Sequence, residues 1–261
     1  MRDETPMTSW RTAIATSDET GLWIRGYDIR DLMRKATFTD LVFLLHQSRL
    51  PRPEERALLD AILISVADHG AGAPSCATAR LVASGNRESL AAAVGAGILA
   101  VGNDHGGAGA ACIEMLARGL EEARRDNLTL GEKAERMVAE AAARKERLPG
   151  LGHRVHSTDP RVSVLFAMAE GAGFGGQGIR LIQEIEIALR KTGRNVPINV
   201  DGALAAVLFE MGFPPAAGKL LFIVGRVAGL SAEVAEEYAR EKPMRIRFDV
   251  AYDGPPPRQI D

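Results

Sequence analysis

Apolar residues that recur every three or four positions dominate this chain and constrain its fold more than any other feature. The pattern predicts helices over 29–47, 53–67, 110–125 and 179–192, joined by short segments rich in glycine and proline. Strand signals are weak throughout. The chain is therefore expected to adopt an all-α fold, with further helices over 89–101, 130–147, 160–172, 202–211, 215–230 and 231–240.

The composition is that of an ordinary globular protein with a sizeable core, since 46% of its 261 residues are hydrophobic and 25% are charged. The net charge of −2 gives no sign of nucleic-acid or anionic-membrane binding. Two cysteines, Cys76 and Cys112, form neither a disulfide framework nor a zinc motif, so we expect buried thiols and no metal site. No apolar stretch is long enough to span a bilayer and the N-terminus lacks a signal-peptide core, which predicts a cytoplasmic protein.

Three glycine-containing motifs carry polar side chains that a helical core would not tolerate without a purpose. Two imidazoles, His105 and His153, and the carboxylate of Asp201 form a candidate set for proton transfer. A carboxylate against an apolar wall has a raised pKa, which suits a role in proton transfer. Structural alternatives remain open: a structural histidine at position 105 and a helix N-cap at position 201. The motifs are Asn103-Asp104-His105-Gly106-Gly107-Ala108, Gly150-Leu151-Gly152-His153-Arg154-Val155 and Asn199-Val200-Asp201-Gly202.

Two other segments resemble functional motifs by letter alone. Residues 173–178 fit G-x-G-x-x-G, but no strand precedes them, so a turn between helices is the better interpretation than a dinucleotide site. The charged segment 128–147 is interpreted as the solvated face of a helix.

The order and surroundings of the three motifs resemble the citrate synthase superfamily over roughly residues 22–254. Asp159-Pro160-Arg161 and Gly225-Arg226 belong to the same pattern. Synthases usually follow the catalytic aspartate with a bulky aromatic residue, whereas Gly202 follows Asp201 here. This detail favours the citryl-CoA lyase branch, the cleaving module also found in ATP-citrate lyase. Ala232-Glu233 also departs from the family, because synthases commonly carry Ala-His there.

The resemblance implies an all-α homodimer with a large and a small helical lobe. We expect one catalytic unit over 1–261, with the small lobe at roughly 150–240. Full-length synthases are considerably longer, and the missing part is mainly N-terminal.

The resemblance also implies a role for each motif residue. His153 would contact the oxygen at the carbon where the bond breaks, His105 would stabilise the thioester enolate, and Asp201 would act as acid and base at the methyl carbon. The carboxylates of the substrate would be held by His69, Arg161, Arg226 and, across the dimer interface, Arg247, with Arg245 as the alternative. Coenzyme A would lie against Leu148, Gly150, Leu151, Gly152 and Asn199.

The leading hypothesis is an acyl-CoA carbon–carbon lyase that cleaves citryl-CoA to acetyl-CoA and oxaloacetate. One alternative is condensation of an acyl-CoA with a 2-oxo acid, as in citrate or 2-methylcitrate synthase. Another is a non-catalytic CoA-binding subunit. We expect no metal and no tightly bound cofactor, with coenzyme A present only as part of the substrate or product. The expected partners are small acyl-CoA and di- or tricarboxylate molecules and a second copy of the chain.

Overall fold

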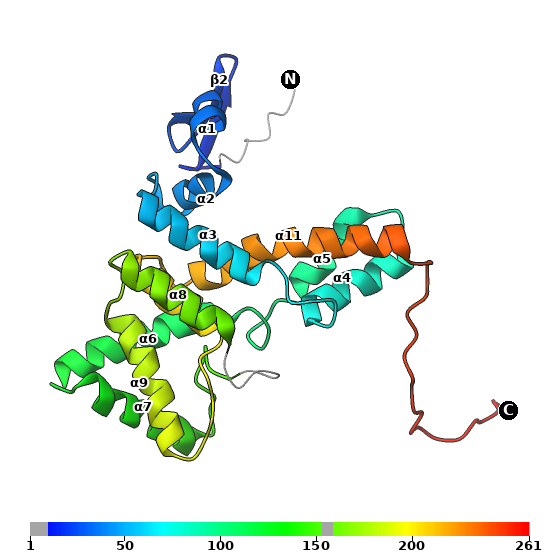
Figure 1. Ribbon diagram of the computed structural model, residues 1–261. Helices are drawn as coiled ribbons and strands as arrows, with labels where there is room; N and C mark the ends of the chain where they lie inside the picture. Colours follow the sequence, from blue (N-terminus) through cyan, green and yellow to red (C-terminus); the bar gives the residue numbers. More distant parts are fainter. Residues whose placement is uncertain (1–9, 153–158, 261) are drawn as a thin grey trace, which may run out of the picture. The chain divides into compact units, whose positions relative to one another are not determined.

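The computed structural model describes residues 10–152 and 159–260, which contain eleven α-helices and one small antiparallel sheet (Figure 1). The expected all-α fold is confirmed. No described helix combines the length and the apolar character needed to cross a membrane. The helices are α1 (Ile29–Lys35), α2 (Phe38–Gln47), α3 (Pro53–Ala67), α4 (Pro74–Gly85), α5 (Leu90–Leu99), α6 (Ala108–Arg125), α7 (Leu130–Arg144), α8 (Pro160–Gly171), α9 (Gln177–Lys191), α10 (Val200–Glu210) and α11 (Ala217–Arg240).

Two predicted helix boundaries are wrong, and local chemistry explains both. The helix expected over 29–47 is two helices, because Thr37 starts α2 with a capping box in which it exchanges hydrogen bonds with Asp40. The helices expected over 215–230 and 231–240 are one helix, α11. Ser231 fits inside it because its hydroxyl donates to the carbonyl of Ala228, at 2.8 Å.

Two elements, α4 and the sheet, are not predicted from the sequence. α4 is built largely of alanine, serine, threonine and cysteine, which provide little contrast between its faces. The strands β1 (Ala15–Asp18), β2 (Gly21–Ile24) and β3 (Tyr27–Asp28) are short and mostly exposed, and they pair antiparallel in the order β1-β2-β3.

The chain divides into two compact units, which are described separately. One comprises Met1–Ala67 and Gly102–Gly225, and the other comprises Asp68–Val101 and Arg226–Asp261. Neither has the bounds of the small lobe expected at roughly 150–240, which stays a prediction.

The first unit is organised around α10. Eight of its eleven residues are buried, on all sides of the helix, which is the pattern of a central helix. Its neighbours α6, α8 and α9 lie close together in Figure 1. The position of α10 is therefore fixed by packing from several directions, and so are the residues at its N-terminus.

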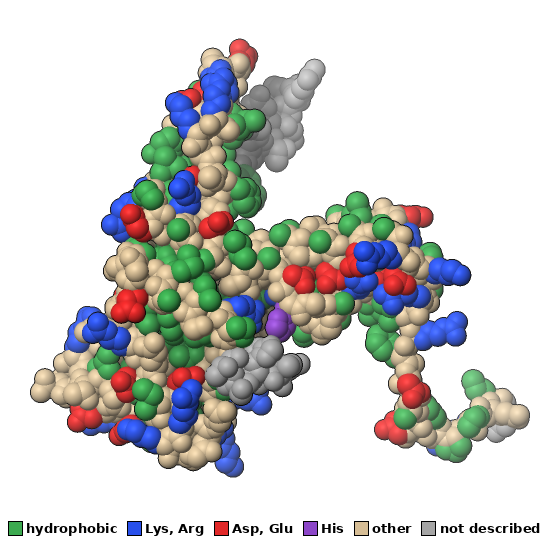
Figure 2. Space-filling model, viewed as in Figure 1, with side chains coloured by type: hydrophobic (Ala, Val, Ile, Leu, Met, Phe, Trp, Pro, Cys, Tyr) green, Lys and Arg blue, Asp and Glu red, His purple; other side chains and the backbone are tan. Residues whose placement is uncertain are grey.

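The second unit packs α4 and α5 against the C-terminal part of α11. Small residues allow the close approach: a Cβ added to Gly97 would lie 2.8 Å from the Leu230 side chain and 2.9 Å from the Ser75 carbonyl oxygen. Acidic and basic side chains alternate along the surface of this unit (Figure 2). Its buried core consists of Ala73, Cys76, Ala79, Ala83, Ala93, Leu230 and Val234.

Candidate active site

A tight loop before α6 carries His105. The backbone N–H groups of Gly102 and His105 each donate to the other residue's carbonyl, at 3.0 and 2.9 Å. Gly106 has φ of +71°, a left-handed conformation that favours glycine. These contacts fix the backbone of His105 immediately before the helix.

Phe222 on α11 supports this loop, and sequence reasoning missed it. Its ring lies edge-on to the His105 ring, with centroids 6.3 Å apart and an interplanar angle of 79°. A side chain at Gly106 would overlap the same ring. An apolar residue inside a long helix is read from sequence as ordinary core, so nothing marked Phe222 as a neighbour of the histidine.

The segment Gly150–Gly152, predicted to bind coenzyme A, is tied to the residues that precede α10. The Gly152 N–H donates to the Pro197 carbonyl at 2.7 Å, and the Asn199 N–H donates to the Gly150 carbonyl at 3.1 Å. Both glycines are left-handed, with φ of +82° and +98°. The chain therefore arrives at His153 from a fixed point, although His153 itself lies outside the described residues.

Two glycines allow this segment to touch α10. A Cβ on Gly150 would lie 2.6 Å from the Cα of Gly202 and 2.8 Å from the thiol sulfur of Cys112. A Cβ on Gly202 would overlap the carbonyl oxygen of Gly150. The backbones meet directly, so this conformation has no room for a bulky side chain at position 202.

Asp201 lies in the first turn of α10 but is not its N-cap. Asn199 is the cap: its side-chain oxygen accepts from the Gly202 N–H at 3.0 Å, while its amide nitrogen donates to the Gly152 carbonyl at 2.8 Å. The structural alternative for Asp201 is therefore wrong. Asp201 is half-buried. Burial is the main cause of the raised pKa of the neighbouring Cys112 thiol, and the negative charge of Asp201 raises that pKa further.

Arg161 lies at the start of α8 and is held from two sides. Its Nε and Nη2 donate to the two oxygens of Asp159 at 2.9 and 2.7 Å. Its Nη1 donates to the Ser65 carbonyl at 3.0 Å. Asp159 also accepts the Val200 N–H at 3.1 Å, which joins the beginnings of α8 and α10. The sequence motif included Asp159 but indicated no role for it.

The second unit contains two more predicted substrate ligands. His69 is exposed in a turn where the Gly70 N–H donates to Asp68 Oδ1 at 2.6 Å. Arg226 is only 2% exposed, and its Nη1 donates to the Ser75 hydroxyl at 2.9 Å. Burial of a guanidinium is costly without polar or anionic partners, and the Ser75 hydroxyl is one such partner here.

The structure separates the two arginines near the C-terminus. Arg245 forms a bidentate pair with the fully buried Glu237, at 2.9 and 2.5 Å, and also contacts Glu241. Arg247 is exposed. Arg245 thus anchors the end of the chain to α11, and Arg247 stays the candidate for a role across an interface.

The departure at Glu233 has a structural reason. Arg80 of α4 contacts Glu233 at 2.5 Å and Glu237 at 3.0 Å, so Glu233 belongs to an ion network between two helices.

Asp68, Cys76 and Glu233 place three possible metal ligands within 4.8 Å of one another. Burial and the nearby Asp68 raise the pKa of the Cys76 thiol, and Arg80 already occupies Glu233, so this group is a poor ligand set.

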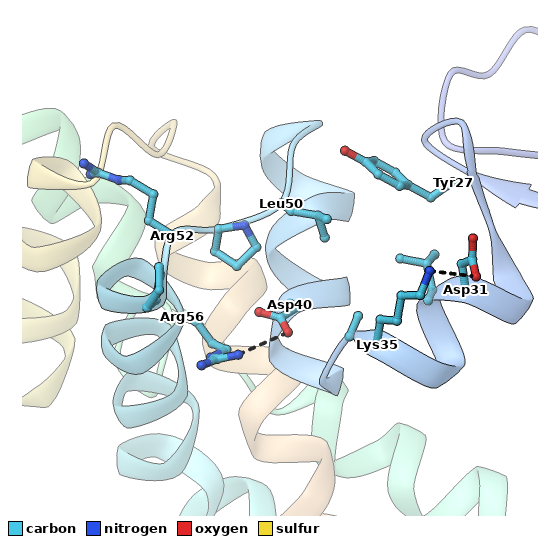
Figure 3. A pocket seen from close by; sticks show the side chains of 11 residues that line it. Tyr27, Asp31, Lys35, Asp40, Leu50, Arg52 and Arg56 are labelled. Carbon is cyan, nitrogen blue, oxygen red and sulfur yellow. Dashed lines mark ion pairs between the residues drawn. The ribbon is translucent and has the colours of Figure 1, made fainter.

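A cavity of about 430 Å³ in the first unit contains none of the predicted site residues (Figure 3). Tyr27 and Leu50 line it together with charged side chains. Lys35 pairs with Asp31 at 3.2 Å and Arg56 with Asp40 at 3.7 Å, which balances those cations.

Within the described part of the first unit, a chain of contacts links several of the predicted residues. α6 begins after the His105 loop and carries Cys112, which contacts Gly150 and lies beside Asp201. Asp159 then connects the start of α10 to Arg161. His69, Arg226 and Arg247 belong to the other unit.

Comparison with known proteins identifies the family to which this chain is related. Residues 49–247 match the family "Citrate synthase, C-terminal domain". "Putative citrate synthase 2" of Mycobacterium bovis is 33% identical over 213 residues, which are 80% of this chain and 54% of that protein. The chain therefore spans about half the length of the curated relatives it matches.

Two solved structures share the fold. Citryl-CoA lyase from Hydrogenobacter thermophilus is 36% identical, with a TM-score of 0.85 and 97% of each chain covered. ATP citrate lyase from Methanothrix soehngenii, in complex with citrate and coenzyme A, has a TM-score of 0.77 at 22% identity, over 95% of this chain and 42% of that one. The family match covers most of the chain, and the expected resemblance is confirmed: the protein belongs to the citrate synthase family.

Proposed function

We propose that this protein is a carbon–carbon lyase that cleaves citryl-CoA, or a closely related hydroxyacyl-CoA, to acetyl-CoA and oxaloacetate. The observation that carries the proposal is Gly202. Its close contact with Gly150 excludes the bulky aromatic residue that synthases carry after the catalytic aspartate. The likeness to a citryl-CoA lyase over nearly the whole of both chains supports the same branch.

The reaction is a retro-Claisen cleavage in which one proton leaves and one returns. His153 accepts the proton of the substrate hydroxyl while the adjacent carbon–carbon bond breaks and the hydroxyl carbon becomes the ketone of oxaloacetate. The electron pair of that bond passes to the thioester as an enolate, which a hydrogen bond from His105 stabilises. Asp201 then donates a proton to the methylene carbon and completes acetyl-CoA.

Basic side chains hold the carboxylates of the substrate in this proposal. They are Arg161, Arg226, His69 and Arg247 of the partner subunit. Coenzyme A lies along Leu148, Gly150, Leu151, Gly152 and Asn199, where a left-handed glycine backbone lets a ligand approach closely. No tightly bound cofactor is required, because the thioester itself makes the carbanion accessible.

The proposal includes a homodimer. Leu90 and Leu99 of α5 are 58% and 88% exposed, and the helix between them is built of alanine, glycine and other apolar residues. An apolar helix face of this kind suits contact with a second copy of the chain. The free cysteines also suit a reducing compartment, and we place the enzyme in the cytoplasm.

Condensation of an acyl-CoA with a 2-oxo acid is the second candidate. It is favoured by the curated relatives, which are named citrate synthases and 2-methylcitrate synthase. It uses the same groups in the opposite direction and ends in thioester hydrolysis. A non-catalytic CoA-binding subunit is the third candidate, and it leaves the presence of His105, His153 and Asp201 without a purpose.

The deciding experiment incubates the purified protein with citryl-CoA, and separately with acetyl-CoA plus oxaloacetate, and follows the CoA species by mass. Acetyl-CoA from the first mixture without free CoA from the second establishes the lyase. Free CoA and citrate from the second establish the synthase. No reaction in either mixture contradicts both enzymatic assignments for these substrates.

A further inference from the structure

Asp159 is a buried carboxylate whose contacts reach two helices that carry proposed site residues. Its side chain is fully buried. Oδ1 accepts from the N–H and the Nε of Arg161, at 3.1 and 2.9 Å, and Oδ2 accepts from Nη2 of Arg161 and from the Val200 N–H, at 2.7 and 3.1 Å. One carboxylate therefore caps α8, fixes the Arg161 guanidinium and holds the first residue of α10.

The hydrogen bond from the Val200 N–H to Asp159 fixes the start of α10, and with it the position of Asp201. Val200 is the first residue of α10, and its N–H has no acceptor inside its own helix. Asp159 supplies that acceptor across 41 positions of sequence. Because Asp201 is the next residue, a shift of Asp159 moves the proposed acid along with the helix start.

The contact with Arg161 leaves that side chain able to bind a ligand. A guanidinium has five N–H donors. Among the described residues, Asp159 and Ser65 engage three of them, and each terminal nitrogen keeps one further N–H. The edge of the guanidinium formed by Nε and Nη2 is thus held by Asp159, and the remaining N–H groups can donate to a substrate carboxylate.

We propose that Asp159 is a positioning residue that couples the substrate carboxylate site at Arg161 to the proton-transfer site at Asp201. This inference rests on the proposed function and adds a group that does not itself touch the substrate. It accounts for a buried acid that packing alone does not require, since burial of a charge is costly without such partners.

The test uses two variants that cut different contacts. Asp159→Asn keeps the size and a capping oxygen but loses the charge that orients both partners. Val200→Pro removes the N–H that Asp159 accepts and places an apolar ring of similar size in the buried position of the valine side chain. Proline is well tolerated at the first position of a helix, and Asn199 already has the extended backbone, φ −104° and ψ 178°, that a following proline requires.

Glu55→Gln provides a matched control. Glu55 is also a buried carboxylate at a helix start, where it pairs bidentately with Arg49 at 2.8 and 2.7 Å and accepts the Arg52 N–H at 2.8 Å. It has no contact with the proposed site among the described residues. Its loss should lower stability to a degree similar to Asp159→Asn and leave the kinetics unchanged.

We expect Asp159→Asn to lower kcat/KM for citryl-CoA about 100-fold, and to weaken oxaloacetate binding about tenfold by calorimetry. Val200→Pro should slow the exchange of the acetyl-CoA methyl hydrogens with deuterium about tenfold or more and leave oxaloacetate affinity unchanged. If Asp159 only stabilised the fold, the variants would change neither kcat/KM nor the rate of methyl hydrogen exchange relative to Glu55→Gln. Kinetics and affinity of both variants equal to those of Glu55→Gln would overturn the inference.

Amide hydrogen exchange keeps this test independent of the proposed function. The first turn of α10 should exchange about tenfold faster in Asp159→Asn than in Glu55→Gln, as expected when its anchoring hydrogen bond is lost. Equal exchange would overturn the positioning role. If the wild-type protein does not cleave citryl-CoA, the proposed reaction fails, and exchange at α10 still decides the role of Asp159.

Discussion

At the scale of single residues, the candidate site depends on positions that have no side chain. Gly150 and Gly202 meet backbone to backbone, which brings the segment before His153 against the helix that carries Asp201. The segment that leads to His153 can therefore lie against the start of the Asp201 helix only while positions 150 and 202 are both glycine.

A methyl group at position 202 tests this contact. We expect Gly202→Ala to lower the free energy of unfolding by about 2 kcal/mol, because an added carbon in a filled space forces the backbone apart. Gly171 on α8 is the control, because a Cβ there meets no atom within 4 Å and alanine suits a helix better than glycine. Urea unfolding should separate the two variants, and equal loss in both would contradict the close packing.

Asp201→Asn tests the proposed acid itself. The change keeps the shape of the side chain and removes its ability to transfer a proton, so we expect the cleavage rate to fall by about 10² to 10⁴. Affinity for coenzyme A should not change, because backbone bonds to Pro197 and Asn199 hold the Gly150–Gly152 segment. Single-turnover kinetics and calorimetry measure the two quantities. Turnover at the wild-type rate would remove Asp201 from the mechanism.

At the scale of the element, α3 shows how a helix is secured at its start. Glu55 is 2% exposed in the first turn, and the hydrogen bonds from Arg49 lower the pKa of its carboxyl to about 2, against an ordinary value of 4.5. A carboxyl whose pKa is depressed in the folded state stabilises the fold above its unfolded pKa. That contribution is present at neutral pH and is lost as the pH falls from about 4.5 towards 2.

We therefore expect Glu55→Gln to cost about 2 kcal/mol of unfolding free energy at pH 7 and progressively less below pH 4.5. Glu54→Gln, on the exposed side of the same turn, should cost little at either pH. Thermal unfolding between pH 7 and pH 3 gives the comparison. A cost that stays constant with pH would show that the Arg49 pair does not supply the stability.

Most of the helices could be predicted from the sequence, whereas α4 and the small sheet could not. α3 is predicted with its bounds, because Leu58, Leu59, Ile62, Leu63 and Val66 recur at helical spacing and Pro53 marks its start. α4 is not predicted, because its buried face, formed by Ser75, Cys76, Ala79 and Ala83, consists of small residues that differ little in hydropathy from exposed ones such as Ala77. The division of 29–47 depends on hydrogen bonds between Thr37 and Asp40, which a hydrophobic pattern does not report.

At the scale of the whole molecule, the family relation made most candidate residues predictable, while their supporting contacts stayed hidden. Short motifs that can be recognised in the sequence contain His105, Arg161 and Asp201. Phe222 and Asp159 act through contacts with residues far away along the chain, such as Val200, and no local pattern encodes such a contact. The division of the site residues between two compact units likewise follows from packing.

The proposed dimer predicts complementation between inactive chains. Arg247→Ala and Asp201→Asn should each lower cleavage by about 100-fold or more. When the two variants are unfolded and refolded together, about one quarter of the wild-type activity should return, because half of the dimers are mixed and each mixed dimer has one intact site. Each variant refolded alone serves as the control. A mixture as inactive as its components would assign Arg247 to its own chain's site.

The two cysteines can report local unfolding of the two compact units of this protein. Cys112 lies in the larger unit and Cys76 in the smaller, and both thiols are free and fully buried. A thiol-specific label can react with either only after the surrounding unit has opened, so the labelling rate follows the opening equilibrium of that unit. Mass analysis of labelled peptides would thus follow the two units separately in the unmodified chain, with no probe introduced.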